Sequence, residues 1–276
     1  MNRFLRIAIN VLVWSAILAY LVFATRHCRE QQQEERLKRV EIRVTDYGER
    51  RAVSPQIVRE WLDDAQIALE GERLAALDTE HIVRMLAAQP HVREVQTYME
   101  QSGTMHITLS QRRPIVRFVR GDVDFYVSDD LWVIPAKMGA AEYVPVVTGD
   151  FGLPFETGWF GRIEEPEATA EKKLHKNYAF LLKLINFVRL TEQSPFWSAA
   201  IVQINVREPH GVAEWREPEI EFVPRVGNHI VALGTLDDAA EKLAKLLLFY
   251  RNVLHYEGWD KYTLIDVRYR GQVVGR

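Results

Sequence analysis

The chain opens with an apolar run followed by a polar one. Residues 7–24 (IAINVLVWSAILAYLVFA) carry no charge, and at about 1.5 Å per residue they would extend about 27 Å, just enough for a bilayer core. Residues 26–39 are charged or polar apart from Cys28 and Leu37, so this run offers no apolar face to bury. The pattern predicts three segments: a short cytoplasmic tail (1–6), a transmembrane helix (7–24) and a charged juxtamembrane spacer (25–39).

A cleaved signal peptide is the rival interpretation of this segment, with Arg3 and Arg6 as its basic region. The apolar run is long for such a peptide and continues into Thr25 and Arg26 without a small-residue cleavage site, which favours a retained anchor. Flanking charges leave the orientation open, because basic residues lie on both sides of the run and long domains translocate largely regardless of them.

Residues 40–113 have the pattern of a compact α+β unit. Apolar and polar residues alternate over residues 40–45, as in a half-buried strand. Ser54 (followed by proline) and Asp78 are both cap residues, and an apolar stripe at helical spacing follows each of them. Alternation resumes over residues 95–109 on either side of a Gln-Ser-Gly turn, which predicts a hairpin. The predicted order is strand, helix, helix, strand, strand.

Residues 114–276 predict a second unit, a mostly antiparallel β-sheet domain with two packed helices. The helices are expected over residues 170–190 and 236–254, where leucine and aromatic residues recur at helical spacing. The paired Asp129 and Asp130 lie at turn spacing between two apolar runs, where aspartate bonds to the local backbone, so we interpret them as a turn. Short apolar runs predict strands at 115–119, 125–127, 131–134, 144–148, 200–206, 220–223, 230–233 and 262–269.

Composition narrows the function. The chain is 47% hydrophobic and 26% charged, with a net charge of -3 and both signs interspersed, which indicates no nucleic-acid-binding surface. Its eight histidines show no metal-binding spacing, and no nucleotide-binding loop or nucleophile elbow occurs. We therefore predict no catalytic residues, no metal site and no cofactor. A membrane-tethered enzyme whose site is assembled from distant residues stays an alternative.

The last predicted strand, residues 262–269, is rich in β-branched and aromatic residues and lies near the end of the sequence. At a sheet edge, such a strand would offer unpaired backbone groups to a partner strand. The alternative is an interior strand in which Asp266 and Arg268 form only a solvent-exposed pair. The residues alone do not decide between these two interpretations.

Order and residues together resemble a known family. The first soluble unit resembles a POTRA domain, most closely at residues 90–95, 105–109 and 111–116, where Gln111 stands in for the acidic residue of the family pattern. With the anchor in front and the closing stretch 260–274 behind, the whole chain resembles the FtsQ/DivIB family of bacterial division proteins.

The resemblance implies an α+β protein with a single N-terminal transmembrane helix, a POTRA-like domain (40–113) and an FtsQ/DivIB-type β domain (114–276). It implies a single-pass protein of the bacterial cytoplasmic (inner) membrane, surrounded by lipid at residues 7–24, with its N-terminus in the cytoplasm. The bulk would lie in the periplasm or extracytoplasmic space, concentrated at the division septum.

The resemblance also implies a role, that of a non-catalytic divisome scaffold that helps control septal peptidoglycan synthesis. Small bitopic coiled-coil proteins like FtsL and FtsB would bind by strand addition at the C-terminal edge, and other divisome proteins through the POTRA-like domain. A membrane-anchored POTRA protein of an envelope transport or assembly system is the alternative. The partner-binding residues that the resemblance implies are Leu264, Asp266, Arg268, Tyr269, Gly271 and Gln272.

Overall fold

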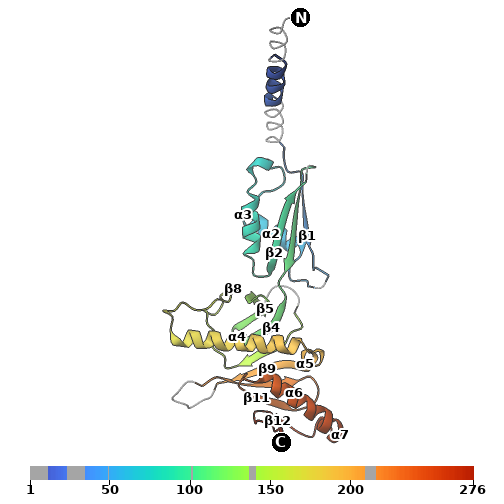
Figure 1. The fold of residues 1–276 in the computed structure, drawn as a ribbon, viewed down its shortest axis with the longest axis vertical. Helices are drawn as coiled ribbons and strands as arrows, with labels where there is room; N and C mark the ends of the chain where they lie inside the picture. Colours follow the sequence, from blue (N-terminus) through green and yellow to red (C-terminus); the bar gives the residue numbers. More distant parts are fainter. Residues whose placement is uncertain (1–11, 24–34, 49, 101, 137–140, 209–215) are drawn as a thin grey trace, which may run out of the picture. The chain divides into compact units, whose positions relative to one another are not determined.

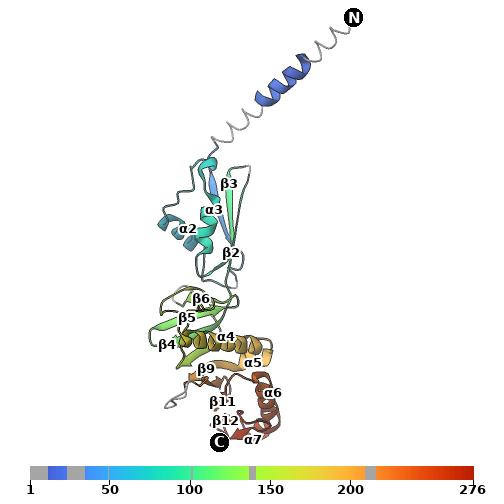
Figure 2. The same cartoon turned by 60° about the vertical axis from the view of Figure 1, so that its left-hand side comes forward.

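The computed structural model describes residues 12–23, 35–48, 50–100, 102–136, 141–208 and 216–276. The chain divides into two compact units, Met1–Gln111 and Arg112–Arg276. Each unit has an apolar core of its own, and Figures 1 and 2 show the two from different sides.

The N-terminal unit is a three-stranded sheet covered by two helices (Figure 1). Strand β3 (Thr104–Gln111) is central: β1 (Arg39–Val44) lies parallel to it, and β2 (Val92–Met99) pairs with it in antiparallel register. Helices α2 (Pro55–Asp64) and α3 (Thr79–Ala87) pack on the face that carries the buried side chains of β3. The predicted order of strand, helix, helix, strand and strand is confirmed.

Both predicted helix starts are confirmed by their caps. The Ser54 hydroxyl accepts a hydrogen bond from the backbone N–H of Ile57 at 3.2 Å, and Pro55 occupies the first helical position. The Asp78 carboxylate accepts from the backbone N–H of His81 at 2.8 Å. Each bond satisfies a backbone donor that a helix leaves unpaired at its N-terminus.

The folded unit begins earlier than the polar run suggested, which corrects the predicted spacer. Leu37 is 1% exposed and belongs to the N-terminal core. Its backbone N–H donates to the Glu72 carbonyl at 2.9 Å, and its own carbonyl accepts from the Gly71 N–H at 2.8 Å. A single apolar residue among charged neighbours leaves no periodic signal, because only this one side chain points inward. Residues 35–39 therefore belong to the folded unit.

Residues 12–23 form a helix whose apolar side chains are exposed. The other residues of the predicted anchor, 7–11 and 24, lie outside the described residues. Within the part of the chain that the structure describes, no helix combines the length and the apolarity that a membrane crossing needs. The anchor over residues 7–24 therefore stays a prediction.

The C-terminal unit is built on a ten-stranded sheet in the order β13-β12-β11-β10-β9-β7-β4-β5-β6-β8. Most neighbouring strands are antiparallel, as predicted, whereas β4–β7, β7–β9 and β11–β12 are parallel. The strands are β4 (Pro114–Arg120), β5 (Val123–Ser128), β6 (Trp132–Pro135), β7 (Val146–Gly149), β8 (Gly161–Arg162), β9 (Ile201–Arg207), β10 (Glu219–Pro224), β11 (Ile230–Gly234), β12 (Leu264–Asp266) and β13 (Val274–Gly275).

Helices pack against this sheet in one continuous core (Figure 1). The two predicted helices are present as α4 (Lys172–Glu192) and α6 (Ala239–Phe249); the second continues through a π-helical turn (Tyr250–Leu254) into α7 (His255–Glu257). A short helix, α5 (Pro195–Ala200), was not predicted. Its Ser194 cap accepts from the Trp197 N–H at 3.4 Å, and the Trp197 side chain is buried.

The closing strand is shorter than predicted and does not form the sheet edge. Only Leu264–Asp266 stay in the ladder, as β12, which runs parallel to β11. The chain then turns, and β13 returns antiparallel along the other side of β12. Of the two interpretations of residues 262–269, the structure shows the interior strand and not the edge, because β13 covers β12 and is itself the outermost strand.

His229 is a buried titratable group in the C-terminal core. Its Nε2 atom lies 2.9 Å from the Tyr250 hydroxyl, and the side chain is 1% exposed. Burial lowers the pKa of His229, while the backbone of Trp259 and the charge of Asp260 oppose this shift. Burial also raises the pKa of Tyr250, so the phenol keeps its proton.

We expect the C-terminal unit to lose stability as the pH falls below about 6.5, the ordinary histidine pKa. The folded pKa of His229 lies below the unfolded one, so the unfolded chain takes up the proton first; this contribution to stability is present above the unfolded pKa and is lost as the pH falls. Thermal unfolding of the full chain at about pH 7.5 and about pH 5 measures this loss of stability, and His229→Asn is the control. An equal decline in both proteins would contradict the assignment to His229.

Candidate functional site

The outer edge of the large sheet is formed by β13 on β12. The backbone N–H of Arg276 donates to the Leu264 carbonyl at 2.9 Å, and the Leu264 N–H donates back to the Arg276 carbonyl at 3.2 Å. Asp266 pairs with Val274 two residues further along. Backbone groups alternate in direction along an antiparallel ladder, so the N–H and carbonyl groups of Val273 and Gly275 point away from β12. These groups make the edge available for backbone pairing.

Gly275 fits this edge for a steric reason. A Cβ atom on this residue would lie 2.5 Å from the ring of Tyr262, a separation at which the atoms overlap. The ring of Tyr262 therefore lies directly beside the edge strand and keeps it free of a side chain at this position. A backbone without a side chain can be approached closely by another strand.

The segment between β12 and β13 is held by helix α6. Lys245 on that helix donates from Nζ to the Val267 carbonyl at 3.0 Å and also to the Tyr269 carbonyl. Gly271 then adopts a φ of +69°, a left-handed conformation that glycine reaches without a steric penalty. Lys245 and Gly271 together direct the chain back so that β13 can pair with β12.

Asp266 and Arg268 form a partly buried ion pair under this segment. The Arg268 guanidinium donates from Nη2 to Asp266 Oδ2 at 2.7 Å and from Nη1 to Glu219 Oε2 on β10 at 3.0 Å. The Asp266 side chain is 1% exposed, whereas that of Arg268 is 40% exposed. The guanidinium lowers the pKa of Asp266, and the carboxylates raise the pKa of Arg268. The pair is therefore charged at neutral pH and links β12 to β10.

The six predicted partner-binding residues consequently fall into two groups. Leu264, Asp266 and Arg268 serve the fold itself through the β13 ladder and the ion pair. Tyr269, which is 49% exposed, and its exposed neighbours Gly271 and Gln272 lie in the turn that leads to β13. The sequence did not point to Lys245, Glu219 or the backbone of Val273–Gly275 as parts of this site. The Arg268 side chain also passes over Gly234, where a Cβ atom would lie 2.8 Å from it.

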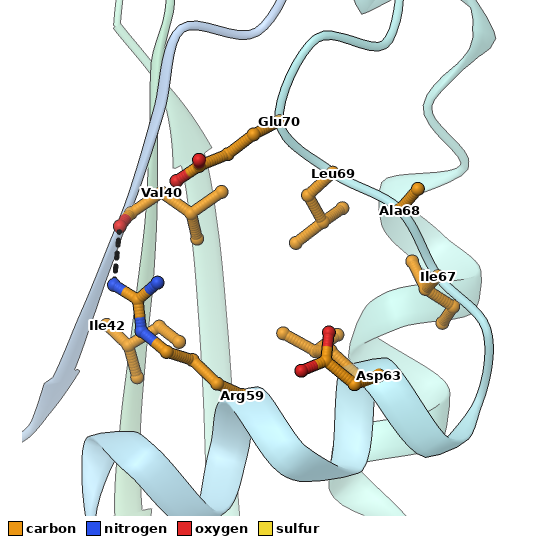
Figure 3. A pocket seen from close by; sticks show the side chains of 9 residues that line it. Val40, Ile42, Arg59, Asp63, Ile67, Ala68, Leu69 and Glu70 are labelled. Carbon is orange, nitrogen blue, oxygen red and sulfur yellow. Dashed lines mark hydrogen bonds between the residues drawn. The ribbon is translucent and has the colours of Figure 1, made fainter.

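Strand β1 is also an outermost strand, in the sheet of the N-terminal unit. A groove between β1 and α2 has a volume of about 280 Å³. Figure 3 shows the side chains that line it. The Arg59 guanidinium donates to the Val40 carbonyl at 3.4 Å, so a side chain already occupies one acceptor of this edge. The groove is lined by Val40, Ile42, Arg59, Leu62, Asp63, Ile67, Ala68, Leu69 and Glu70.

The chemistry that these two edges offer is backbone pairing. Among the described residues, no group of three histidine, cysteine, aspartate or glutamate side chains is placed to hold a metal ion. Near the C-terminal edge, the Asp266 carboxylate is buried and accepts a hydrogen bond from the Arg268 guanidinium. At the β13 edge, the outward backbone groups can pair with an extended polypeptide, and the Asp266–Arg268 ion pair is already occupied within the fold.

Two family models match the chain, and together they cover nearly all of its two folded units. Residues 36–110 match a POTRA-like domain. Residues 113–276, more than half of the chain, match the FtsQ/DivIB, C-terminal related domain. A comparison with curated protein sequences finds no match. On the strength of the longer match and of the POTRA-like unit in front of it, the chain belongs to the FtsQ/DivIB family.

Proposed function

We propose that this protein is a non-catalytic scaffold of bacterial cell division that binds small bitopic coiled-coil partners, like FtsL and FtsB, by strand addition at β13. The family supports the general role in cell division. The observation that carries the specific role is the outermost position of β13, with the backbone groups of Val273 and Gly275 directed outwards. A partner strand would extend the sheet there.

Side chains in the preceding turn would supply specificity. Tyr269 is half exposed, and its carbonyl is fixed by Lys245, so the ring is presented from a rigid backbone. Exposed tyrosines on a rigid support often dominate binding energy at protein interfaces. Gly271 and Gln272 would lie beside one end of the partner strand. Leu264, Asp266 and Arg268 would contribute indirectly, because they stabilise the conformation of the edge.

The same proposal includes the membrane and the other unit. A helix over residues 7–24 would anchor the chain in the cytoplasmic membrane, with the folded units in the extracytoplasmic space at the septum. There the scaffold would help control septal peptidoglycan synthesis. The POTRA-like unit would recruit other divisome proteins, and the groove beside β1 supports this part of the proposal because it lies along an outermost strand.

Tyr269→Ala is expected to reduce capture of the coiled-coil partner from membranes by about 30-fold, the effect of losing about 2 kcal/mol at an interface centre. Tyr256→Ala is the matched control, because Tyr256 is 80% exposed and lies on α7, outside the turn that leads to β13. Co-purification with the tagged full chain, followed by quantitative mass spectrometry, gives the amount of partner captured by each variant relative to the parent chain. Equal capture by both variants would contradict a role for the turn.

Gly271→Pro provides a second arm of this experiment. Proline fixes φ near -65°, whereas Gly271 has a φ of +69°, so the turn that returns β13 to the sheet cannot form. We expect partner capture to be lost while the thermal unfolding of the unit, which rests on the large core, shifts only slightly. Retained capture would mean that the partner binds elsewhere.

A further inference from the structure

A pocket with aromatic walls lies near β8, at the opposite edge of the large sheet from β13. Its volume is about 280 Å³. Phe155 is one of its lining residues, and its ring centroid lies 5.8 Å from that of Phe125 and 5.0 Å from that of Trp159. Trp159 and Phe160 are 39% and 41% exposed. Large aromatic rings left open to solvent at the mouth of a pocket are typical of binding sites.

The pocket and its loop are negatively charged. Asp122, in the turn between β4 and β5, and Asp124, near the start of β5, both line the pocket. Asp124 holds the Arg117 guanidinium with two hydrogen bonds of 2.8 Å, whereas Asp122 is exposed. The loop that contributes Trp159, residues 150–171, contains six carboxylates and a single basic residue, Arg162. The loop therefore carries a net negative charge, while Lys172 and Lys173 follow it directly and Arg120 of β4 donates to the Phe151 carbonyl within it.

We propose that this pocket binds the arginine or lysine side chain of a basic segment of a partner protein. The aliphatic stem and cationic head of such a side chain would lie against the ring of Trp159, where cation–π attraction operates. Asp122 would supply the counter-charge. The acidic loop would attract a basic segment over a longer range, in a salt-dependent manner.

The charge distinguishes this occupant from two others that an aromatic pocket can bind. A neutral sugar stacks on tryptophan but gains nothing from the excess of carboxylates on the loop. An apolar side chain would fill the pocket, yet it would also force Asp122 to lose part of its hydration without a partner. A cation uses both the rings and the charge. This surface lies beyond the proposed β13 edge and would allow a second contact.

The test uses ¹⁹F NMR of the full chain in detergent, labelled with 5-fluorotryptophan, with Trp159→Phe assigning the resonance. The probes are N-acetylated, C-amidated Gly-Arg-Gly and Gly-Lys-Gly. Gly-Gln-Gly, capped in the same way, is the uncharged control. We expect the Trp159 signal to shift with both cationic peptides and not with the control. Addition of about 0.5 M salt should weaken the binding, because surface charges are then screened.

A matched variant pair separates charge from fold. Asp122→Asn should weaken peptide binding about threefold, as expected for loss of an exposed charge partner, and should leave the other tryptophan signals unchanged. Glu241→Gln, an acidic residue on α6 outside the pocket, should bind like the parent. The proposal is overturned if Gly-Gln-Gly shifts Trp159 equally, if Asp122→Asn binds unchanged, or if chitotriose shifts Trp159 while the cationic peptides do not.

Discussion

Replacing Gly149 with alanine is expected to destabilise the C-terminal unit severely. Gly149 ends β7 with a φ of +92°. A Cβ atom there would lie 2.1 Å from the Val206 carbonyl oxygen and 2.6 Å from Asn205 Oδ1. Because the nearest obstacle is backbone of the neighbouring strand β9, no side-chain rotation relieves the overlap. We expect a loss of about 4 kcal/mol or more in the free energy of unfolding.

Gly121→Ala is the matched control for Gly149→Ala. Gly121 also has a positive φ, +56°, but a Cβ atom there would meet nothing within 4 Å. Only the left-handed backbone then opposes alanine, which costs about 1–2 kcal/mol. Urea unfolding of the full chain, followed by circular dichroism, compares the two variants. Similar losses in both would show that the close approach of β7 and β9 is not what requires glycine at 149.

Arg268→Ala is expected to destabilise the same unit by about 3 kcal/mol, because it leaves the buried Asp266 carboxylate without its partner. The Asp266 side chain is 1% exposed and accepts hydrogen bonds from the Arg268 backbone N–H, Nε and Nη2. A buried charge that loses such a partner pays its desolvation without compensation. Chemical unfolding of the full chain measures the loss.

A double-mutant cycle separates the pair from general damage to the edge. Asp266→Asn removes the charge, so Asp266→Asn with Arg268→Ala should cost clearly less than the sum of the two single changes. Additive losses would contradict a coupled pair. Glu219→Gln should cost well under 1 kcal/mol, as expected for an exposed salt bridge, because it touches the guanidinium from its exposed side.

Local signals let the sequence predict most elements of both units. Ser54 with Pro55 and Asp78 marked helix starts that the caps confirm. Helix α5 was missed although Ser194 with Pro195 repeats the first of these signals, because a six-residue helix is too short to show a period. The parallel pairing of β7 with β4 and β9 depends on contacts between distant parts of the chain, which no local pattern encodes.

The partner-binding role of the closing segment stays a prediction, and the structure changes which residues form the sheet edge there. The sequence pointed to the final strand, yet the edge depends on a two-residue strand, β13, which is too short to leave an alternating pattern. It also depends on Gly271 in the turn and on Lys245, which is more than twenty residues away from Tyr269 in the sequence. The family resemblance implied that Asp266 contacts the partner, whereas Arg268 neutralises its carboxylate inside the fold.

In the complex, β13 is expected to accept a partner strand. Hydrogen exchange resolved to single amides, on the full chain with and without a co-purified coiled-coil partner, tests it most directly. The Val273 and Gly275 amides point away from β12, so they should exchange freely alone and slow by tenfold or more in the complex, on the order expected when exposed amides become paired. Unchanged exchange at both amides in a complex that is protected elsewhere, for example along β1 or β8, would contradict the claim.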